Sequence, residues 1–134
     1  MRVRKDESRP LRAEDDVVRA RQAVRSWAVE MSFSLVDQTK LVTAASELAR
    51  NTVVYGGGGT LRMEALEDGA RKGLRLVFAD EGPGIPDLET ALRDGYTTGN
   101  GLGLGLGGAK RLVNEFAIES HVGEGTRITV VKWK

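Results

Sequence analysis

Two stretches in the first half of the chain carry apolar residues at helical spacing. From Glu14 to Met31 the apolar positions recur every three or four residues, which predicts a helix with one buried face. A second helix is predicted to begin after Ser34, a residue suited to the N-cap position, and to run to about Tyr55. Its apolar side would carry Leu41, Ala45, Leu48 and Thr52. The glycines Gly56–Gly59 would end this helix abruptly.

The second half of the chain is dominated by strand patterns. Alternation over Thr60–Leu66 and the β-rich run Leu74–Ala79 predict a hairpin with its bend at Asp68-Gly69. Two closing strands are predicted near Ala117–Val122 and Arg127–Lys132. Shorter elements are expected at three further places: a strand over Met1–Arg4 before a proline-containing connection, a helix over Leu88–Arg93, and a helix from about Gly108 to Phe116.

This order of elements predicts a fold class. Successive strands joined by short turns give a mostly antiparallel sheet, and the helices would cover one face of it. We therefore expect a two-layer α+β sandwich. The 134 residues contain no internal repeat or linker, so residues 1–134 are expected to form one domain.

Composition and charge exclude several classes of function. Lys and Arg number 20 against 19 for Asp and Glu, a balance that argues against nucleic acid as the main partner. No apolar run approaches the roughly 18 residues that a membrane-spanning helix needs. The absence of cysteine excludes disulfides and thiolate chemistry. The first residues lack the apolar stretch of a secretory signal, so a cytoplasmic location is expected.

Glycine is the one marked departure from average composition, with 17 residues, many of them in Gly56–Gly59 and Gly99–Gly108. A glycine-rich loop that leads into a helix can bind phosphate through its backbone amides. The pattern of Gly103, Gly105 and Gly108 also fits a dinucleotide fingerprint, but no strand precedes it. A P-loop would need Gly-Lys-Ser or Gly-Lys-Thr, whereas Lys110 follows Ala109. A plain flexible linker is the remaining alternative.

Glu47 and Asn51 lie four residues apart on the second predicted helix and therefore on one face of it. Glu47 could take a proton from an attacking hydroxyl or water. Asn51 could offer its side-chain oxygen to Mg²⁺ bound to a phosphate. The alternative is an ordinary solvated helix face.

Asp80 follows directly after the apolar strand Leu74–Ala79. A carboxylate beside apolar neighbours needs a hydrogen-bond donor, and the amino group of adenine is a planar donor of this kind. Gly82 and Gly84 would let the backbone approach the ring, although Gly-Pro-Gly also makes ordinary surface turns. Thr126, in the final hairpin, is a further candidate for a water-mediated contact to a base. The single His121, without a nucleophile or metal partner in the sequence, is interpreted as structural.

The order and spacing of these motifs resemble the GHKL superfamily of ATPases and kinases, over about residues 14–133. The shared motifs are Glu-x-x-x-Asn on a helix, Asp-x-Gly-x-Gly after a strand, Gly-x-Gly-x-Gly before a helix, and Gly-Thr before a strand. The short chain leaves no room for the additional domain of the larger members. It is most similar to the free-standing serine kinases of the anti-sigma-factor type, and among these to the switch kinase associated with the stressosome.

The resemblance implies a Bergerat fold, ATP and Mg²⁺ as cofactors, and a role for each motif residue. Glu47 would be the catalytic base and Asn51 the Mg²⁺ ligand. Asp80 would accept from adenine, with Gly82, Gly84 and Thr126 completing the adenine site. Gly101, Gly103 and Gly105 would belong to the ATP lid. The chain departs from the family in having no basic residue in the stretch Tyr96–Asn100 before these glycines, so a charged group on the γ-phosphate would come from elsewhere, with Arg50 as the candidate, or be absent.

The resemblance also implies partners. The expected substrate is a serine or threonine of a STAS-domain protein, and activation of a PPM-type phosphatase is a second expected role. A sigma factor is a less favoured partner, and a homodimer is compatible with the family. Two alternatives stay open at this point: an anti-sigma factor that sequesters its sigma factor, and a non-catalytic binding module gated by ATP.

Overall fold

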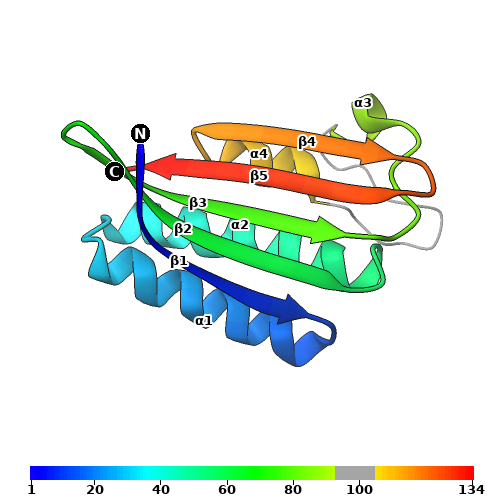
Figure 1. The fold of residues 1–134 in the computed structure, drawn as a ribbon, viewed down its shortest axis with the longest axis horizontal. Coiled ribbons are helices and arrows are strands. Elements are labelled where there is room, and N and C mark those ends of the chain that lie inside the picture. Colours follow the sequence, from blue (N-terminus) through cyan, green and yellow to red (C-terminus); the bar gives the residue numbers. More distant parts are fainter. Residues whose placement is uncertain (93–104) are drawn as a thin grey trace.

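The computed structural model describes residues 1–92 and 105–134, which form one sheet with helices packed against one of its faces (Figure 1). The strands are β1 (Arg2–Leu11), β2 (Gly59–Asp68), β3 (Arg71–Asp80), β4 (Glu115–His121) and β5 (Gly125–Trp133). The helices are α1 (Glu14–Glu30), α2 (Leu35–Val54), α3 (Leu88–Ala91) and α4 (Leu106–Arg111). The strand order is β1-β2-β3-β5-β4, and each neighbouring pair is antiparallel. The predicted two-layer α+β fold is confirmed.

The two long helices begin in different ways. Ser34 precedes α2, and its Oγ accepts from the backbone N–H of Asp37 at 3.1 Å, as the sequence predicted. Ala13 precedes α1 and has no capping oxygen. The carboxylate of Asp16, in the first turn of α1, instead accepts from the N–H groups of Arg12 and Ala13, just before the helix, at 2.8 and 3.2 Å. None of the helices in the described ranges is long and apolar enough to cross a membrane.

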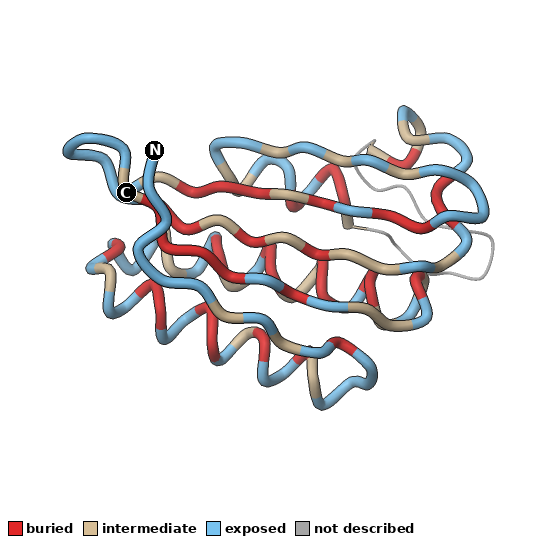
Figure 2. The backbone as a smooth tube through the Cα atoms, in the orientation of Figure 1, coloured by how far each residue is buried: buried red, intermediate tan, exposed pale blue. Residues whose placement is uncertain are grey.

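The core lies between the sheet and the helices (Figure 2). Alternate residues of each strand point into it, so the even-numbered side chains of β3 and β5 are buried together with odd-numbered ones of β2. The inward-facing apolar residues at the centre are Leu61, Met63, Leu76, Phe78, Ile128 and Val130. The predicted apolar side of α2 packs against them, and its four residues Leu41, Ala45, Leu48 and Thr52 are all buried.

The first strand is longer than the sequence predicted. A strand over Met1–Arg4 followed by a connection was expected, but β1 pairs with β2 as far as Leu11. Its side chains are mostly charged and exposed, so hydrophobic alternation gives no signal there. Pro10 lies opposite Thr60. An edge strand tolerates proline because it has a hydrogen-bonded neighbour on one side only.

The predicted helix from Gly108 to Phe116 is wrong at both ends. Gly105 has a φ of 68°, a left-handed conformation that glycine adopts without strain, and α4 begins directly after it at Leu106. The helix ends at Arg111. The chain then joins the sheet at Asn114, whose N–H donates to the carbonyl of Val131 at 2.9 Å, and Phe116 belongs to β4.

Candidate functional site

Three polar side chains form a row across the helix-facing side of the sheet, at the end where β3 and β4 finish and β5 begins. Asp80, the last residue of β3, lies opposite Thr126 of β5, and Thr126 lies opposite Ser120 of β4. On the other side of Asp80 the register partner is Gly59 of β2, which has no side chain. The sheet thus ends in a strip of hydrogen-bonding side chains on β3, β5 and β4.

The carboxylate of Asp80 is held by backbone groups. Its Oδ1 accepts from the N–H of Gly82 at 2.9 Å, and the backbone of Thr126 donates to it as well. Burial raises the pKa of Asp80, and these two hydrogen bonds oppose the rise without cancelling it. In the described part of the chain Asp80 has no ion-pair partner. A half-buried carboxylate without a cation retains acceptor capacity for a planar donor such as an amino group on a purine.

Glycines are packed tightly around this carboxylate. A Cβ on Gly56 would lie 2.4 Å from Cγ of Asp80, and one on Gly82 would lie 2.5 Å from the carbonyl oxygen of Gly56. Gly84 has a φ of 75°, and a Cβ there would meet the carbonyl of His121 at 2.3 Å. The structure therefore brings the predicted residues Gly82 and Gly84 to Asp80 and to the β4–β5 hairpin respectively. Gly56 was predicted only as a helix terminator, and its contact with Asp80 was missed.

Glu47 and Asn51 lie one turn apart on α2, as predicted. Asn51 is only 6% exposed, so the alternative of an ordinary solvated helix face is wrong for this residue. Its Oδ1 is buried and has no hydrogen-bond partner among the described residues. Buried polar groups are normally paired, so this amide oxygen has acceptor capacity that the described residues leave unused. The backbone carbonyl of Asn51 accepts from Gly56, which links this turn of α2 to the glycine beside Asp80.

A magnesium ion fits the side-chain oxygen of Asn51. Mg²⁺ is usually held by one or two protein oxygens together with waters and substrate phosphates, rather than by a cage of protein ligands. In residues 1–92 and 105–134, no three histidine or acidic side chains gather in a way that could hold a metal alone. Asn51 as the metal ligand therefore remains a prediction that the geometry accommodates.

Gly105, the last glycine of the segment that was predicted to belong to the site, lies beside α2. Gly105 precedes α4, and a Cβ placed on it would lie 2.4 Å from Oε2 of Glu47. The end of the segment therefore contacts the predicted base directly. Gly101 and Gly103 lie outside the described residues. Arg50 is exposed and its guanidinium is 3.6 Å from the carboxylate of Glu14.

Ser120 and Tyr55 complete the walls of this region and were not predicted as site residues. The Oγ of Ser120 is 2.8 Å from Oγ1 of Thr126 and accepts from the N–H of Ile85 at 2.7 Å. The Tyr55 hydroxyl donates to the carbonyl of Gly84 at 2.9 Å. The strand predicted over Ala117–Val122 contains the signal for Ser120, because alternation along a strand places Ser120 on the same face of the sheet as the apolar residue Ile118.

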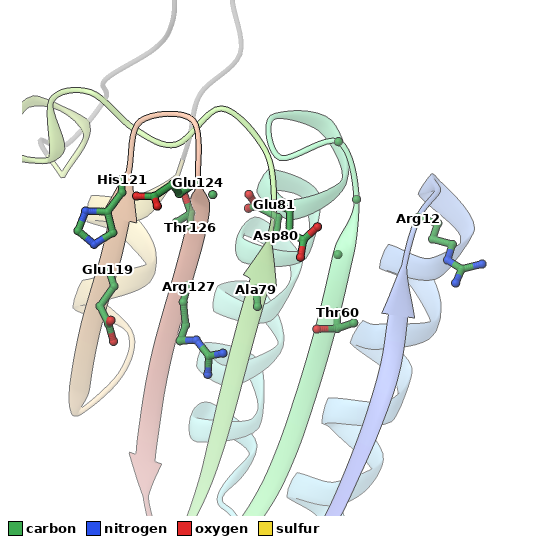
Figure 3. A pocket seen from close by; sticks show the side chains of 14 residues that line it. Arg12, Thr60, Ala79, Asp80, Glu81, Glu119, His121, Glu124, Thr126 and Arg127 are labelled. Carbon is green, nitrogen blue, oxygen red and sulfur yellow. The ribbon is translucent and has the colours of Figure 1, made fainter.

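A hollow of about 820 Å³ opens at the same end of the molecule, and its labelled side chains lie mainly on the sheet face away from the helices (Figure 3). It touches Asp80 and Thr126, but Glu47, Asn51 and Gly105 do not line it. The chemistry described above therefore lies on the opposite side of the sheet from most of this hollow. His121 is exposed and lines it, and its interpretation as a structural residue stays a prediction.

Comparison with known proteins agrees with this arrangement. Residues 10–132 match the family described as the histidine kinase-like ATPase domain, and the chain belongs to that family. It is 48% identical over 118 residues to the serine/threonine-protein kinase RsbT of Bacillus subtilis, covering 88% of this chain and 89% of the relative. It is 29% identical over 121 residues to the anti-sigma F factor of Geobacillus kaustophilus, covering 84% and 81% of the two chains.

Solved structures share the fold at low identity. The RsbU and RsbW domains of a Mycobacterium tuberculosis protein match with a TM-score of 0.63 and 20% identity, over 97% of this chain and 33% of that longer one. The SiaB–SiaC complex of Pseudomonas aeruginosa matches with a TM-score of 0.61 and 13% identity, over 99% and 91%. The predicted membership of the GHKL-type serine/threonine kinases is confirmed by the match to RsbT and by the family.

Proposed function

We propose that this protein binds Mg-ATP at the end of the sheet beside α2 and transfers the γ-phosphoryl group to a serine or threonine of a partner protein. The observation that carries the proposal is the orphaned, buried Oδ1 of Asn51, one turn from Glu47 on α2. The 48% identity to a serine/threonine-protein kinase supports the reaction class. The row of Asp80, Thr126 and Ser120 supports a purine at the neighbouring position.

Each group has a distinct task in this proposal. The Asp80 carboxylate accepts from the amino group of adenine, while Gly56 and Gly82 let the backbone pack closely against this carboxylate. Asn51 Oδ1 holds Mg²⁺, which when bound neutralises charge on the phosphates. Glu47 accepts the proton of the attacking hydroxyl as its oxygen bonds to the γ-phosphorus and the bond from that phosphorus to ADP, the leaving group, breaks.

A groove on the outer side of the helices supports a protein as the phosphate acceptor. It has a volume of about 450 Å³ and is lined by residues of α1 and α2: Arg21, Gln22, Arg25, Val42, Thr43, Ser46 and Glu47. Glu47 thus faces an open surface from which a hydroxyl on another protein can reach it. Arg21 and Arg25 form no ion pair within the described ranges and give this surface positive charge, which favours an acidic partner.

Phosphotransfer by single variants tests the proposal. Glu47→Ala should lower transfer from ATP to the partner by about 10²–10⁴-fold and keep Mg-ATP binding, because a base acts mainly in the transition state. Asn51→Ala should weaken nucleotide binding with Mg²⁺ present and have little effect in EDTA. Glu30→Ala is the matched control, since its surface ion pair with Lys5 has little energetic weight. Equal loss of binding in both site variants, regardless of metal, would contradict the assigned roles.

The partner is proposed from resemblance to the anti-sigma-factor kinases: a STAS-domain protein as substrate, and a PPM-type phosphatase as a second protein that this chain activates. Incubation with labelled ATP and a panel of STAS-domain proteins, each also with its serines and threonines replaced, identifies the acceptor. A second candidate, sequestration of a sigma factor, is favoured by the 29% identity to an anti-sigma F factor. Tight sigma-factor binding without phosphorylation of any STAS protein would select that candidate instead.

A further inference from the structure

The contact between Gly105 and Glu47 joins the start of α4 to the proposed base on α2. A Cβ added to Gly105 would lie 2.4 Å from Oε2 of Glu47, 3.2 Å from its Cδ and 3.1 Å from its Cβ. Cβ atoms do not approach other heavy atoms more closely than about 3.0 Å, so the Glu47 carboxylate occupies the space that a side chain at position 105 would need. Only glycine at this position leaves the carboxylate where it lies.

The backbone of Gly105 is fixed by the packing of α4. Its carbonyl accepts from the N–H of Ala109 at 2.9 Å, which closes the first turn of the helix. Leu106 and Ala109 in this turn are fully buried in the core. Moving the turn away from α2 would open a cavity beneath these two side chains. A larger residue at position 105 is therefore accommodated by the Glu47 side chain and not by a shift of α4.

The Glu47 side chain has room to move. Among residues 1–92 and 105–134 its carboxylate forms no hydrogen bond and no ion pair. It is partly exposed and lines the groove between α1 and α2, so the carboxylate can turn outward. A long side chain without polar partners can adopt several staggered rotamers. Its direction is then set by the surfaces that it contacts, and Gly105 provides the surface against the carboxylate.

We infer that Gly105 is a positioning residue that acts through Glu47: because it lacks a side chain, the carboxylate packs against its backbone in the direction from which it serves as the base. This inference rests on the role of Glu47 in the proposed function. It gives position 105 a task separate from phosphate binding by backbone amides. The substitution Gly105→Ala separates the two tasks, because it keeps the backbone N–H and displaces the carboxylate.

The contact itself is measured by NMR on the nucleotide-free full chain. The wild type should show nuclear Overhauser effects between the α-protons of Gly105 and the side chain of Glu47. Three-bond couplings across χ1 and χ2 of Glu47 should report one dominant rotamer. In Gly105→Ala these couplings should change to those of another rotamer or to averaged values.

Gly69→Ala is the matched control for backbone strain. Gly69 has a φ of 63°, close to the 68° of Gly105, but a Cβ on it would have no heavy atom within 4 Å. Alanine is strained at both positions because both are left-handed. The two variants should therefore lower the urea midpoint of unfolding to a similar extent, while only Gly105→Ala changes the Glu47 couplings.

Phosphotransfer tests the consequence for the reaction, with the acceptor that the panel of STAS-domain proteins identifies. Gly105→Ala should lower kcat about 10²-fold and leave the KM for ATP within about twofold, since a misplaced catalytic group acts on the chemical step. Gly69→Ala should change neither value. In a Glu47→Ala background, Gly105→Ala should cause no further loss of kcat, because the group that it displaces is gone.

Each outcome bears on a different claim. A wild type without contact between Gly105 and Glu47 in NMR would overturn the inference, whatever the activity. It would also be overturned by a Gly105→Ala protein with wild-type kcat, or by a loss of kcat that is equally large in the Glu47→Ala background. A loss confined to the KM for ATP would assign Gly105 to phosphate binding instead. Wild-type transfer by Glu47→Ala would overturn the proposed role of Glu47, while the packing contact seen by NMR would still stand.

Discussion

Two carboxylates on the same sheet are removed from solvent and held in opposite ways. Glu64 of β2 lies on the face away from the helices, directly opposite Arg75 of β3. Its Oε1 is 2.7 Å from Nε of Arg75, and its Oε2 is 3.7 Å from Nε of Arg62. Arg75 lowers the pKa of Glu64, chiefly through this hydrogen bond, by more than burial raises it. Asp80 has two backbone donors and no cation in the described part of the chain, and burial raises its pKa.

The difference separates a carboxylate that stabilises the fold from one that is available to a ligand. Glu64 is paired by its own chain and needs no other partner. Burial of the Asp80 carboxylate opposes its ionisation and raises its pKa, a cost to the charged form that a donor on a ligand can offset. Perturbed acidic groups of this kind are typical of functional sites. Three experiments test whether the two carboxylates differ in this way.

The largest effect is expected from Arg75→Met, which leaves Glu64 buried without its main partner. Removing one member of a buried ion pair costs about 3–5 kcal/mol. Arg62 remains near the carboxylate, so we expect a loss of about 3 kcal/mol in the free energy of unfolding, measured in urea. ATP affinity should not change. Arg62→Met is the control and should have a smaller effect, because Arg62 is exposed and more distant. An unfolding midpoint unchanged by Arg75→Met would contradict the structural role of the pair.

An intermediate effect is expected from Asp80→Asn, and it should fall on binding rather than on folding. The amide presents donors where the adenine amino group also donates, and an unpaired buried group costs about 1–3 kcal/mol. ATP affinity should therefore fall at least tenfold, while the free energy of unfolding is not lowered by a similar amount. Glu81→Gln, a neighbouring exposed residue, serves as the control. A folded Asp80→Asn protein with wild-type affinity in calorimetry would remove Asp80 from the adenine site.

The sequence predicted the parts of the site that depend on local pattern. Periodicity located α2 and hence Glu47 and Asn51, and the strand β3 placed Asp80 at its end. Contacts between segments far apart in the chain could not be predicted, because they depend on how the elements pack. Gly56 meets Asp80 only after α2 and β3 are in place. Asn51 is buried by that same packing, and Ser120 becomes a site residue only through the register of β4 with β5.

The smallest effect, and the sharpest contrast, is in how the two carboxylates make stability depend on pH. Asp80 has a raised pKa in the folded state, so as the pH rises from about 4, the unfolded chain loses this proton first. Stability contributed by Asp80 is therefore present at low pH and is lost as the pH rises through the folded pKa. Glu64 has a lowered pKa, so its contribution is present above about pH 4.3 and is lost as the pH falls through the folded pKa. Subtracting the unfolding profile of Asp80→Asn from that of the wild type should give a curve that falls with pH. The same subtraction for Glu64→Gln should give a curve that rises, and two curves of the same sign would show that the carboxylates are held alike.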